Sequence, residues 1–267
     1  MKKNDYFKKL LSATLLLFFK IYDTSKGGQK LKSNLNLSDL QIDIVKNLRR
    51  YGYFKIENYL SQNQCEKMCN EIDHLINIKH PKLIVDEQQS DHRLNGINNF
   101  SNEINLFTND KFIYDIARKL SDREELPRFT LGALLKYTDG NLGSGAGWHR
   151  DSLGFQFKAM VYLSNVNQKT GAFQYYSKSH RKLYKFSNYL INLSKGFTDL
   201  VRYSNSKIES LNENNLVTFN APAGTLILFN SSGIHRGSPI KEGSRYAITN
   251  YYFNKPWNKA WDEILIK

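Results

Sequence analysis

A histidine and an aspartate near the middle of the chain have the types and spacing of metal ligands. His149 and Asp151 are separated by one residue and follow a glycine-rich loop. In extended backbone, side chains two positions apart lie on the same face, so this imidazole and this carboxylate can reach one metal ion. A surface pair or a helix N-cap gives the same pattern, so the pair alone does not establish a metal site.

A second histidine strengthens this prediction. His235 stands 86 positions after His149 and follows the apolar run 223–230, in a chain that contains six histidines. Two histidines and one carboxylate bind Fe(II) on one face and leave the opposite positions open for other molecules. His149, Asp151 and His235 therefore predict an open metal site of the catalytic type.

A cation follows ten positions later, where Arg245 begins an expected strand over residues 245–253. In a barrel this guanidinium would point inward, where a buried cation requires an anionic partner. A small dicarboxylate co-substrate would supply that partner through a bidentate pair, which is a strong and directional contact. The alternative is an arginine paired with a carboxylate of the protein itself.

The elements that must position these residues change in type along the chain. Ser38 and Ser61 precede apolar residues at helical spacing, and a third helix is predicted over 109–120. From Pro127 onward, short apolar or alternating segments predict strands at 129–137, 155–163, 172–176, 216–219, 225–229 and 245–253. Helices followed by strands predict an α+β chain, mainly β, whose second half is a sandwich or barrel with helices packed outside.

Several blocks, taken in order, resemble the phytanoyl-CoA dioxygenase-like branch of the Fe(II)/2-oxoglutarate-dependent dioxygenases. They are 147–151 (GWHRD), 158–166 (KAMVYLSNV), 170–173 (TGAF), 177–181 (SKSHR), 223–225 (AGT), 235–237 (HRG) and 243–245 (GSR). The resemblance covers roughly residues 38–253. The order and spacing of the blocks make it more specific than any single motif.

The resemblance implies a fold and a set of site residues. The fold is a double-stranded β-helix, or cupin-like jelly roll, with flanking N-terminal helices and a metal at one mouth. By resemblance, His149, Asp151 and His235 are the iron ligands, and Arg245 holds the distal carboxylate of 2-oxoglutarate. The expected cofactors are Fe(II), 2-oxoglutarate as co-substrate, and O2.

In such enzymes a residue on the strand before the His-x-Asp motif usually contacts the co-substrate as well. Lys136 and Tyr137 both stand there, and they alternate between the two faces of the strand, so only one can point inward. We favour Tyr137 for this position. The segment 177–180 (SKSH) lacks the Pro and Gly of the family's turn, and we interpret His180 as structural or near the substrate, with no metal role.

The expected activity is a dioxygenase reaction on a small organic or lipid-like molecule, by default a hydroxylation that releases succinate and CO2. Two alternatives stay open at this point. One is a jelly-roll binding protein without turnover, which the intact ligand set and Arg245 disfavour. The other is a cupin-type enzyme with a different metal, such as Zn or Mn, which Arg245 as a 2-oxoglutarate anchor also disfavours.

The charge of the chain is unevenly placed. The 267 residues carry a net charge of +13, and residues 1–36 hold eight lysines against two aspartates, a net of +6. No nucleic-acid-binding motif accompanies this charge, so no nucleic-acid partner is expected. We predict a basic extension over 1–36 and a single catalytic domain over 37–267, with variable segments near 81–107 and 182–215 as candidates for a substrate lid.

The N-terminal extension contains ten mainly apolar residues, 10–19, flanked by lysines. Ten residues are too few to span a bilayer, which needs about 20. Residues 1–22 are therefore expected to pack on the domain or to rest on a membrane surface as a peripheral contact. The two cysteines, Cys65 and Cys69, form no disulfide framework and predict a reducing, cytoplasmic location. The oligomeric state is not predicted.

Overall fold

Helices occupy most of the first part of the chain, and short capping motifs fix where two of them begin. The computed structural model describes residues 30–31, 35–194 and 201–254. Ser38 accepts a hydrogen bond from the backbone of Gln41, whose side chain accepts one from the backbone of Ser38, and Ser61 makes the same capping box. These bonds satisfy amide groups that a helix start leaves free, so both predicted helix starts are confirmed. The helices are α2 (Asp39–Arg50), α3 (Gln62–Asn77), α4 (Asn102–Thr108), α5 (Lys111–Ser121), α6 (Lys182–Ser194) and α7 (Asn205–Glu209).

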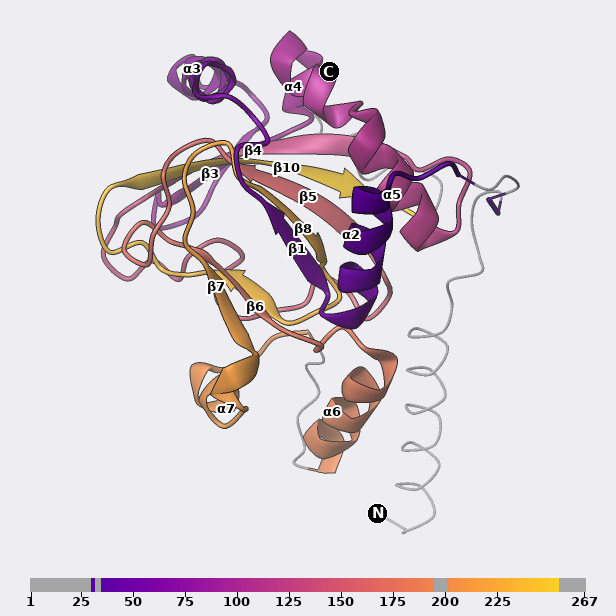
Figure 1. The fold of residues 1–267 in the computed structure, drawn as a ribbon. Coiled ribbons are helices and arrows are strands. Elements are labelled where there is room, and N and C mark those ends of the chain that lie inside the picture. The colour runs from indigo at the N-terminus through magenta and orange to yellow at the C-terminus, as the bar shows by residue number, and fades with distance from the viewer. Residues whose placement is uncertain (1–29, 32–34, 195–200, 255–267) are drawn as a thin grey trace.

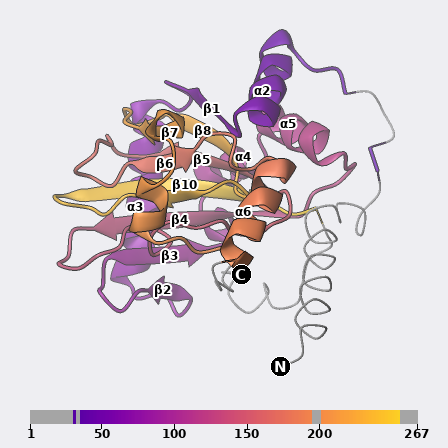
Figure 2. The same cartoon turned by 90° about the horizontal axis from the view of Figure 1, so that it is seen from below.

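The strands form two antiparallel sheets. The larger sheet has the order β1-β8-β5-β10-β4-β3-β2, which Figure 2 shows from one edge to the other, and the smaller sheet has the order β7-β6-β9. The larger sheet consists of β1 (Tyr53–Ile56), β8 (Leu226–Asn230), β5 (Phe157–Tyr162), β10 (Ser244–Tyr252), β4 (Arg128–Lys136), β3 (Asp91–Asn95) and β2 (Leu83–Val85). The smaller sheet consists of β7 (Leu216–Phe219), β6 (Phe173–Tyr176) and β9 (His235–Gly237). All six predicted strands are present, with ends within two residues of those expected.

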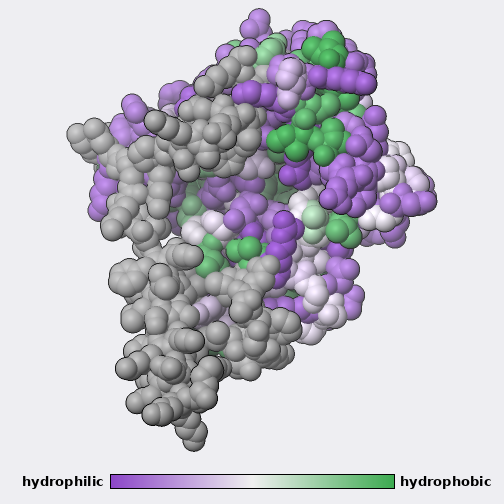
Figure 3. Space-filling model, turned by 180° about the vertical axis from the view of Figure 1, so that it is seen from behind, coloured by the Kyte–Doolittle hydropathy of each residue, from purple (hydrophilic) through white to green (hydrophobic). Residues whose placement is uncertain are grey.

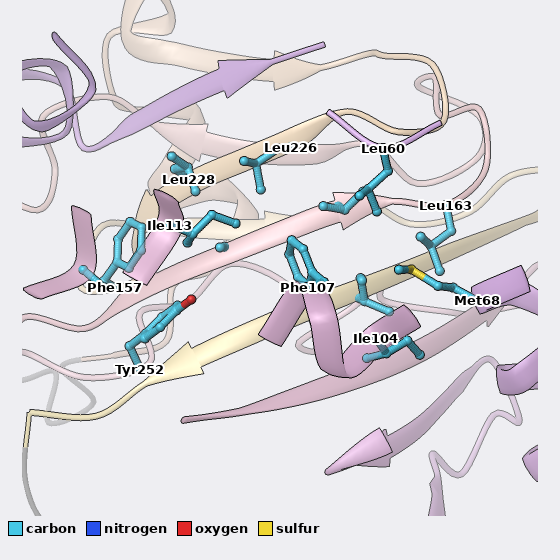
Figure 4. Close-up of a cluster of buried hydrophobic side chains, with 14 of the residues drawn as sticks. Leu60, Met68, Ile104, Phe107, Ile113, Phe157, Leu163, Leu226, Leu228 and Tyr252 are labelled. Atoms are coloured by element: carbon cyan, nitrogen blue, oxygen red, sulfur yellow. The ribbon is translucent and has the colours of Figure 1, made fainter. Parts of the chain in front are cut away.

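The two faces of the larger sheet pack against different layers. Helices α2, α4 and α5 lie against one face, and the smaller sheet lies opposite the other face (Figure 1). The helix-facing layer is a large apolar core, in which Figure 4 shows Phe107 and Ile113 of the helices turned toward Phe157 and Leu228 of the strands. Helices outside a two-sheet body confirm the predicted jelly-roll class.

Where described residues form the surface seen from behind, it is mostly hydrophilic, with hydrophobic residues in separate patches (Figure 3). Cys65 is fully buried in the helix-facing core and Cys69 packs against it. Burial raises the pKa of the Cys69 thiol to about 12, and both cysteines act as packing residues.

The two segments predicted as variable loops contain regular structure. No strand was predicted within residues 81–107, but β2 and β3 extend the larger sheet there, and α4 begins within the segment. The polar sequence of β3 gives little strand signal, but its backbone pairs with β4 from Asp91 to Asn95. Residues 182–215 do form an insertion between β6 and β7, and α6 and α7 lie within it.

Most of the basic N-terminal extension, including residues 10–19, lies outside the described residues. The membrane-surface contact expected of residues 1–22 therefore concerns residues outside the described part of the chain. Among the residues that the structure describes, no helix has both the length and the apolar character needed to cross a membrane.

Candidate active site

The backbone brings the two predicted histidine ligands face to face. His149 and His235 pair as an isolated antiparallel bridge, with N–H···O distances of 2.9 and 2.8 Å. Their ring centroids are 4.4 Å apart. Because β9 carries His235 and the loop after β4 carries His149, this bridge joins chain segments that are 86 residues apart.

Each imidazole is held in one tautomer. Nδ1 of His149 lies 2.8 Å from the carbonyl oxygen of Gly147, and Nδ1 of His235 lies 2.9 Å from that of Gly233. A carbonyl oxygen can only accept, so each Nδ1 carries a proton, and in the neutral ring Nε2 is then the nitrogen with the free lone pair. A histidine that donates through one ring nitrogen is in the form that binds a metal through the other.

Asp151 completes the cluster. Its Oδ1 lies 3.5 Å from Nε2 of His149, and its Oδ2 lies 3.8 Å from Nε2 of His235. One ligand atom from each of the three residues lies within 4.8 Å of the others, an arrangement that could hold a metal ion. The backbone N–H of Asp151 donates to the carbonyl of Ser231, which ties the aspartate to the segment that precedes His235.

The protonation states of the cluster suit a divalent cation. Burial lowers the pKa of His235 to about 3, so this imidazole is neutral near pH 7. Burial disfavours the charged form of Asp151, but the Lys158 ammonium and the two histidines outweigh it and hold the pKa of this carboxyl well below its usual range. A neutral imidazole and an ionised carboxylate are the forms that a metal requires.

A pocket of roughly 640 Å³, counting the part open to solvent, contains the cluster. Its lining includes Leu131, Ala133 and Leu135 of β4, Lys158 and Met160 of β5, Phe173 of β6, Phe229 of β8, and Arg245, Ala247, Thr249 and Tyr251 of β10. These residues alternate along their strands, so one face of the larger sheet forms the floor.

Arg245 lies in this pocket as a buried cation. Its side chain donates to the carbonyl of Gly171, while its buried Nε has no hydrogen-bond partner. Among the described residues, no carboxylate lies within 4 Å of the guanidinium, which disfavours the alternative of an internal ion pair. A buried, unpaired guanidinium fits a carboxylate of a bound dicarboxylate.

Two glycines are needed for close approach around these groups. A Cβ at Gly145 would lie 2.1 Å from Cε1 of His149, and a Cβ at Gly237 would lie 2.8 Å from Nη2 of Arg245. Gly145 also has a φ of +82°, which side chains rarely adopt. Larger residues here would displace the predicted ligand or the predicted anchor.

The structure does not place the predicted second co-substrate contact in the pocket. Tyr137 is 49% exposed and its hydroxyl donates to Asp139, while Lys136 is exposed as well. Strand β4 ends at Lys136, so the inward alternation stops at Leu135, which lines the pocket instead. The role expected of Tyr137 is therefore corrected to that of a surface residue.

Two pocket cations were not identified from the sequence. Lys158 lies on β5 beside Asp151, and Arg93 of β3 lines the pocket wall with its guanidinium paired to Asp91. A lysine within the otherwise apolar run 157–163 was the available signal for the first. Arg93 was missed because no strand was predicted over the residues that form β3.

Two further buried polar residues, Arg150 and His180, support the segments around the cluster. Arg150, between the two ligands, is buried and donates to the carbonyls of Ser179 and Ser232, so it braces these loops rather than filling space. Burial lowers the pKa of His180 to about 4, and its Nε2 bonds the carbonyl of Arg49. His180 thus has the structural position expected of it, away from the metal cluster.

Comparisons with known proteins agree with this geometry. A family model described as phytanoyl-CoA dioxygenase matches residues 48–246. A search of curated proteins found no match. Among solved structures, the chain is similar to the epimerase SnoN in complex with Fe3+, alpha ketoglutarate and nogalamycin RO, with 14% identity, a TM-score of 0.59, and 80% of this chain and 83% of that chain covered.

Two further solved structures share the fold. One is HygX from Streptomyces hygroscopicus with nickel and 2-oxoglutarate bound, with 16% identity, a TM-score of 0.54 and coverage of 83% of this chain and 90% of that chain. The other is a Pseudomonas putida prolyl-4-hydroxylase, with 12% identity, a TM-score of 0.52 and coverage of 80% and 98%. Together with the family match over most of the chain, these findings show that it belongs to the phytanoyl-CoA dioxygenase family of Fe(II)- and 2-oxoglutarate-dependent dioxygenases.

Proposed function

We propose that His149, Asp151 and His235 bind Fe(II), that Arg245 binds the distal carboxylate of 2-oxoglutarate, and that the enzyme hydroxylates a small organic or lipid-like substrate. The observation that carries the proposal is the convergence of three metal-type ligand atoms within 4.8 Å in the same pocket as the buried guanidinium of Arg245, which has no carboxylate of the described residues within 4 Å. A metal cluster and a carboxylate anchor in one pocket are what a chelating dicarboxylate needs.

The residues of the chain orient the metal ligands and the co-substrate, and they exclude water. The backbone bridge and the two Nδ1 bonds fix the orientation of both imidazoles, and Arg245 fixes one end of the co-substrate relative to them. When bound, Fe(II) couples the oxidation of 2-oxoglutarate to succinate and CO2 with transfer of one oxygen atom of O2 to a C–H bond of the substrate. The apolar walls, which include Met160, Phe173 and Phe229, keep this chemistry away from bulk water.

The pocket also bears on the class of substrate. Its side walls combine apolar residues with Arg93 and Tyr251, and the similar epimerase SnoN is in complex with a small molecule, nogalamycin RO. We therefore propose a small-molecule partner. The cytoplasmic location and the membrane contact of residues 1–22 stay predictions from the sequence, which liposome flotation of the full chain and of a variant lacking residues 1–22 would test.

The proposed function is tested by succinate formation from 2-oxoglutarate in the presence of Fe(II) and O2 without added substrate, because enzymes of this class turn over slowly when uncoupled. The wild type is expected to form succinate, and His149→Ala is expected to form none. His74→Ala is the matched control, since His74 is exposed on α3 and lies outside the pocket. A folded wild type that forms no succinate would favour the non-catalytic alternative, and activity restored only by another metal would favour the alternative cupin-type enzyme.

A further inference from the structure

Lys158 is the charged group nearest to the predicted aspartate ligand. Its Nζ lies 2.6 Å from Oδ2 of Asp151 and 3.8 Å from the centroid of the Tyr251 ring, and its side chain is 5% exposed. The residues paired with it across the sheet are Phe229 and Tyr251, neither of which is charged. The ammonium therefore has Asp151 as its one carboxylate partner among the described residues.

The two ends of this pair differ in rigidity. Lys158 stands on β5, which is hydrogen-bonded to β8 on one side and to β10 on the other. Asp151 stands in a segment between strands, where its backbone is tied by one bond to Ser231. A carboxylate on an irregular segment can rotate about its side-chain bonds, and a contact from a rigid strand removes that freedom.

The contact also makes the two carboxylate oxygens unequal. Oδ2 accepts from the ammonium, while Oδ1 has no lysine or arginine of the described residues within 4 Å and faces Nε2 of His149 at 3.5 Å. A free carboxylate beside a divalent ion can bind through one oxygen or through both. With one oxygen occupied by Lys158, binding through the other is favoured.

Stability alone does not account for a lysine at this position. Burying the Lys158 ammonium costs desolvation energy that its attraction to the partly exposed Asp151 barely repays, and an apolar residue of the same size is often neutral or stabilising. The same strand places apolar side chains, Met160 and Tyr162, at the next inward positions. The lysine occurs at the inward position that reaches Asp151.

We propose that Lys158 is a positioning residue that keeps Asp151 a one-oxygen ligand and thereby preserves the open positions that 2-oxoglutarate occupies. This inference rests on the metal site of the proposed function. Without the ammonium, Asp151 takes both oxygens to the metal, the metal stays bound, and one position needed by the co-substrate is lost. Loss of Lys158 is therefore expected to lower the affinity for 2-oxoglutarate without lowering the affinity for the metal.

The test uses Co(II), whose visible spectrum reports coordination geometry, with the full-length protein. For Lys158→Met, Co(II) is expected to bind at least as tightly as to the wild type, with an altered spectrum. The dissociation constant of 2-oxoglutarate for the Co(II) protein is expected to rise about tenfold or more, a range typical of groups that orient metal ligands. Lys158→Gln, which loses the charge and the reach, is expected to act in the same direction and serves if the Met variant does not melt cooperatively.

Lys185→Met is the matched control. Lys185 is buried to the same extent as Lys158 but donates to the carbonyl of Leu153 and the hydroxyl of Ser232, with no carboxylate partner among the described residues. It is expected to lower the unfolding temperature and to leave the Co(II) spectrum unchanged. This control separates the loss of a buried ammonium from the loss of the Asp151 contact.

Two results would overturn the inference. One is a folded Lys158→Met whose Co(II) spectrum and 2-oxoglutarate affinity, within twofold, equal those of the wild type. The other is a parallel loss of Co(II) and 2-oxoglutarate binding, which would assign Lys158 to general support of the site. If His149→Ala binds Co(II) as the wild type does, the proposed function itself fails and this inference fails with it.

Discussion

The two faces of the larger sheet use the same strands for different purposes. On β5, Phe157, Ala159 and Val161 point into the helix-facing core and are fully buried among apolar side chains. The intervening residues Lys158 and Met160 point to the other face and line the pocket. Because successive side chains of a strand point to opposite faces, neighbouring residues of β5 serve the core and the pocket in turn.

The comparison shows where this protein can carry buried charge. The helix-facing core is a large cluster of apolar side chains, whereas the pocket face holds Lys158, Asp151 and Arg245 within one cavity. Burying charge costs free energy unless it is paired, so the apolar face must supply the stability that the pocket face does not. Variants on the two faces should therefore change different quantities.

The largest expected effect is on the pocket face. His235→Ala removes one of the three ligands, so metal-dependent succinate formation is expected to fall below detection. Cooperative thermal unfolding should persist, because the helix-facing core is untouched. Retention of more than a tenth of the wild-type rate would show that His235 is not a ligand.

On the opposite face, Ile248→Ala is expected to lower the free energy of unfolding by about 2–5 kcal/mol, since it opens a cavity beside the helices. Ile248 is fully buried in the helix-facing core, although it stands on β10 next to the pocket residues Ala247 and Thr249. Denaturant titration measures this loss of unfolding free energy. The affinity for 2-oxoglutarate should stay within twofold, and a large change in it would contradict the separation of the two faces.

A buried histidine outside both faces should make stability depend on pH. The unfolded chain binds a proton on His180 near pH 6.5, whereas burial lowers the pKa in the folded state to about 4. Between these values the unfolded state holds more protons, so acidification from pH 6.5 to 4 removes stability, up to about 3 kcal/mol from this group. His180→Gln should flatten this part of the stability profile measured by denaturant titration, and an unchanged slope would show that His180 is protonated in the folded protein.

Arg245→Met tests the proposed binding of the distal carboxylate of 2-oxoglutarate. Losing a charged hydrogen bond of about 1.5–3 kcal/mol should raise the dissociation constant of 2-oxoglutarate roughly 10- to 100-fold, with metal affinity little changed. Calorimetric titration of the Co(II) protein measures both constants. Equal affinity in the wild type and the variant would remove Arg245 from the co-substrate site.

The smallest effect is expected from Tyr137→Phe. Because this ring lies at the surface with its hydroxyl on Asp139, the affinity for 2-oxoglutarate should stay within twofold of the wild-type value. A clear loss of affinity in the same titration would show that Tyr137 contacts the co-substrate and that the pocket extends beyond Leu135.

Local patterns account for what the sequence predicted. Ser38 and Ser61 cap their helices through contacts three residues away, and apolar alternation marks the strands of the second half. His149 and His235 could be linked across 86 residues because each stands next to a recognisable strand or loop. The family and the jelly-roll class, which the resemblance implied, are confirmed.

What the sequence did not predict depends on tertiary pairing. Strand β3 reads Asp-His-Arg-Leu-Asn and lacks apolar alternation, so it forms because β4 offers it a partner. That error concealed Arg93. Tyr137 was placed inward by extending the alternation of β4 by one residue beyond the last paired position, and the strand's end is set by its pairing with β10.

The most direct test of the account is an anaerobic titration of Fe(II) and 2-oxoglutarate followed by visible absorption. We predict a weak metal-to-ligand charge-transfer band when both are added to the wild type, absent with either alone and absent in His235→Ala. A well-folded wild type without this band, or an equal band in His235→Ala, would contradict the assignment of the pocket as the iron and 2-oxoglutarate site.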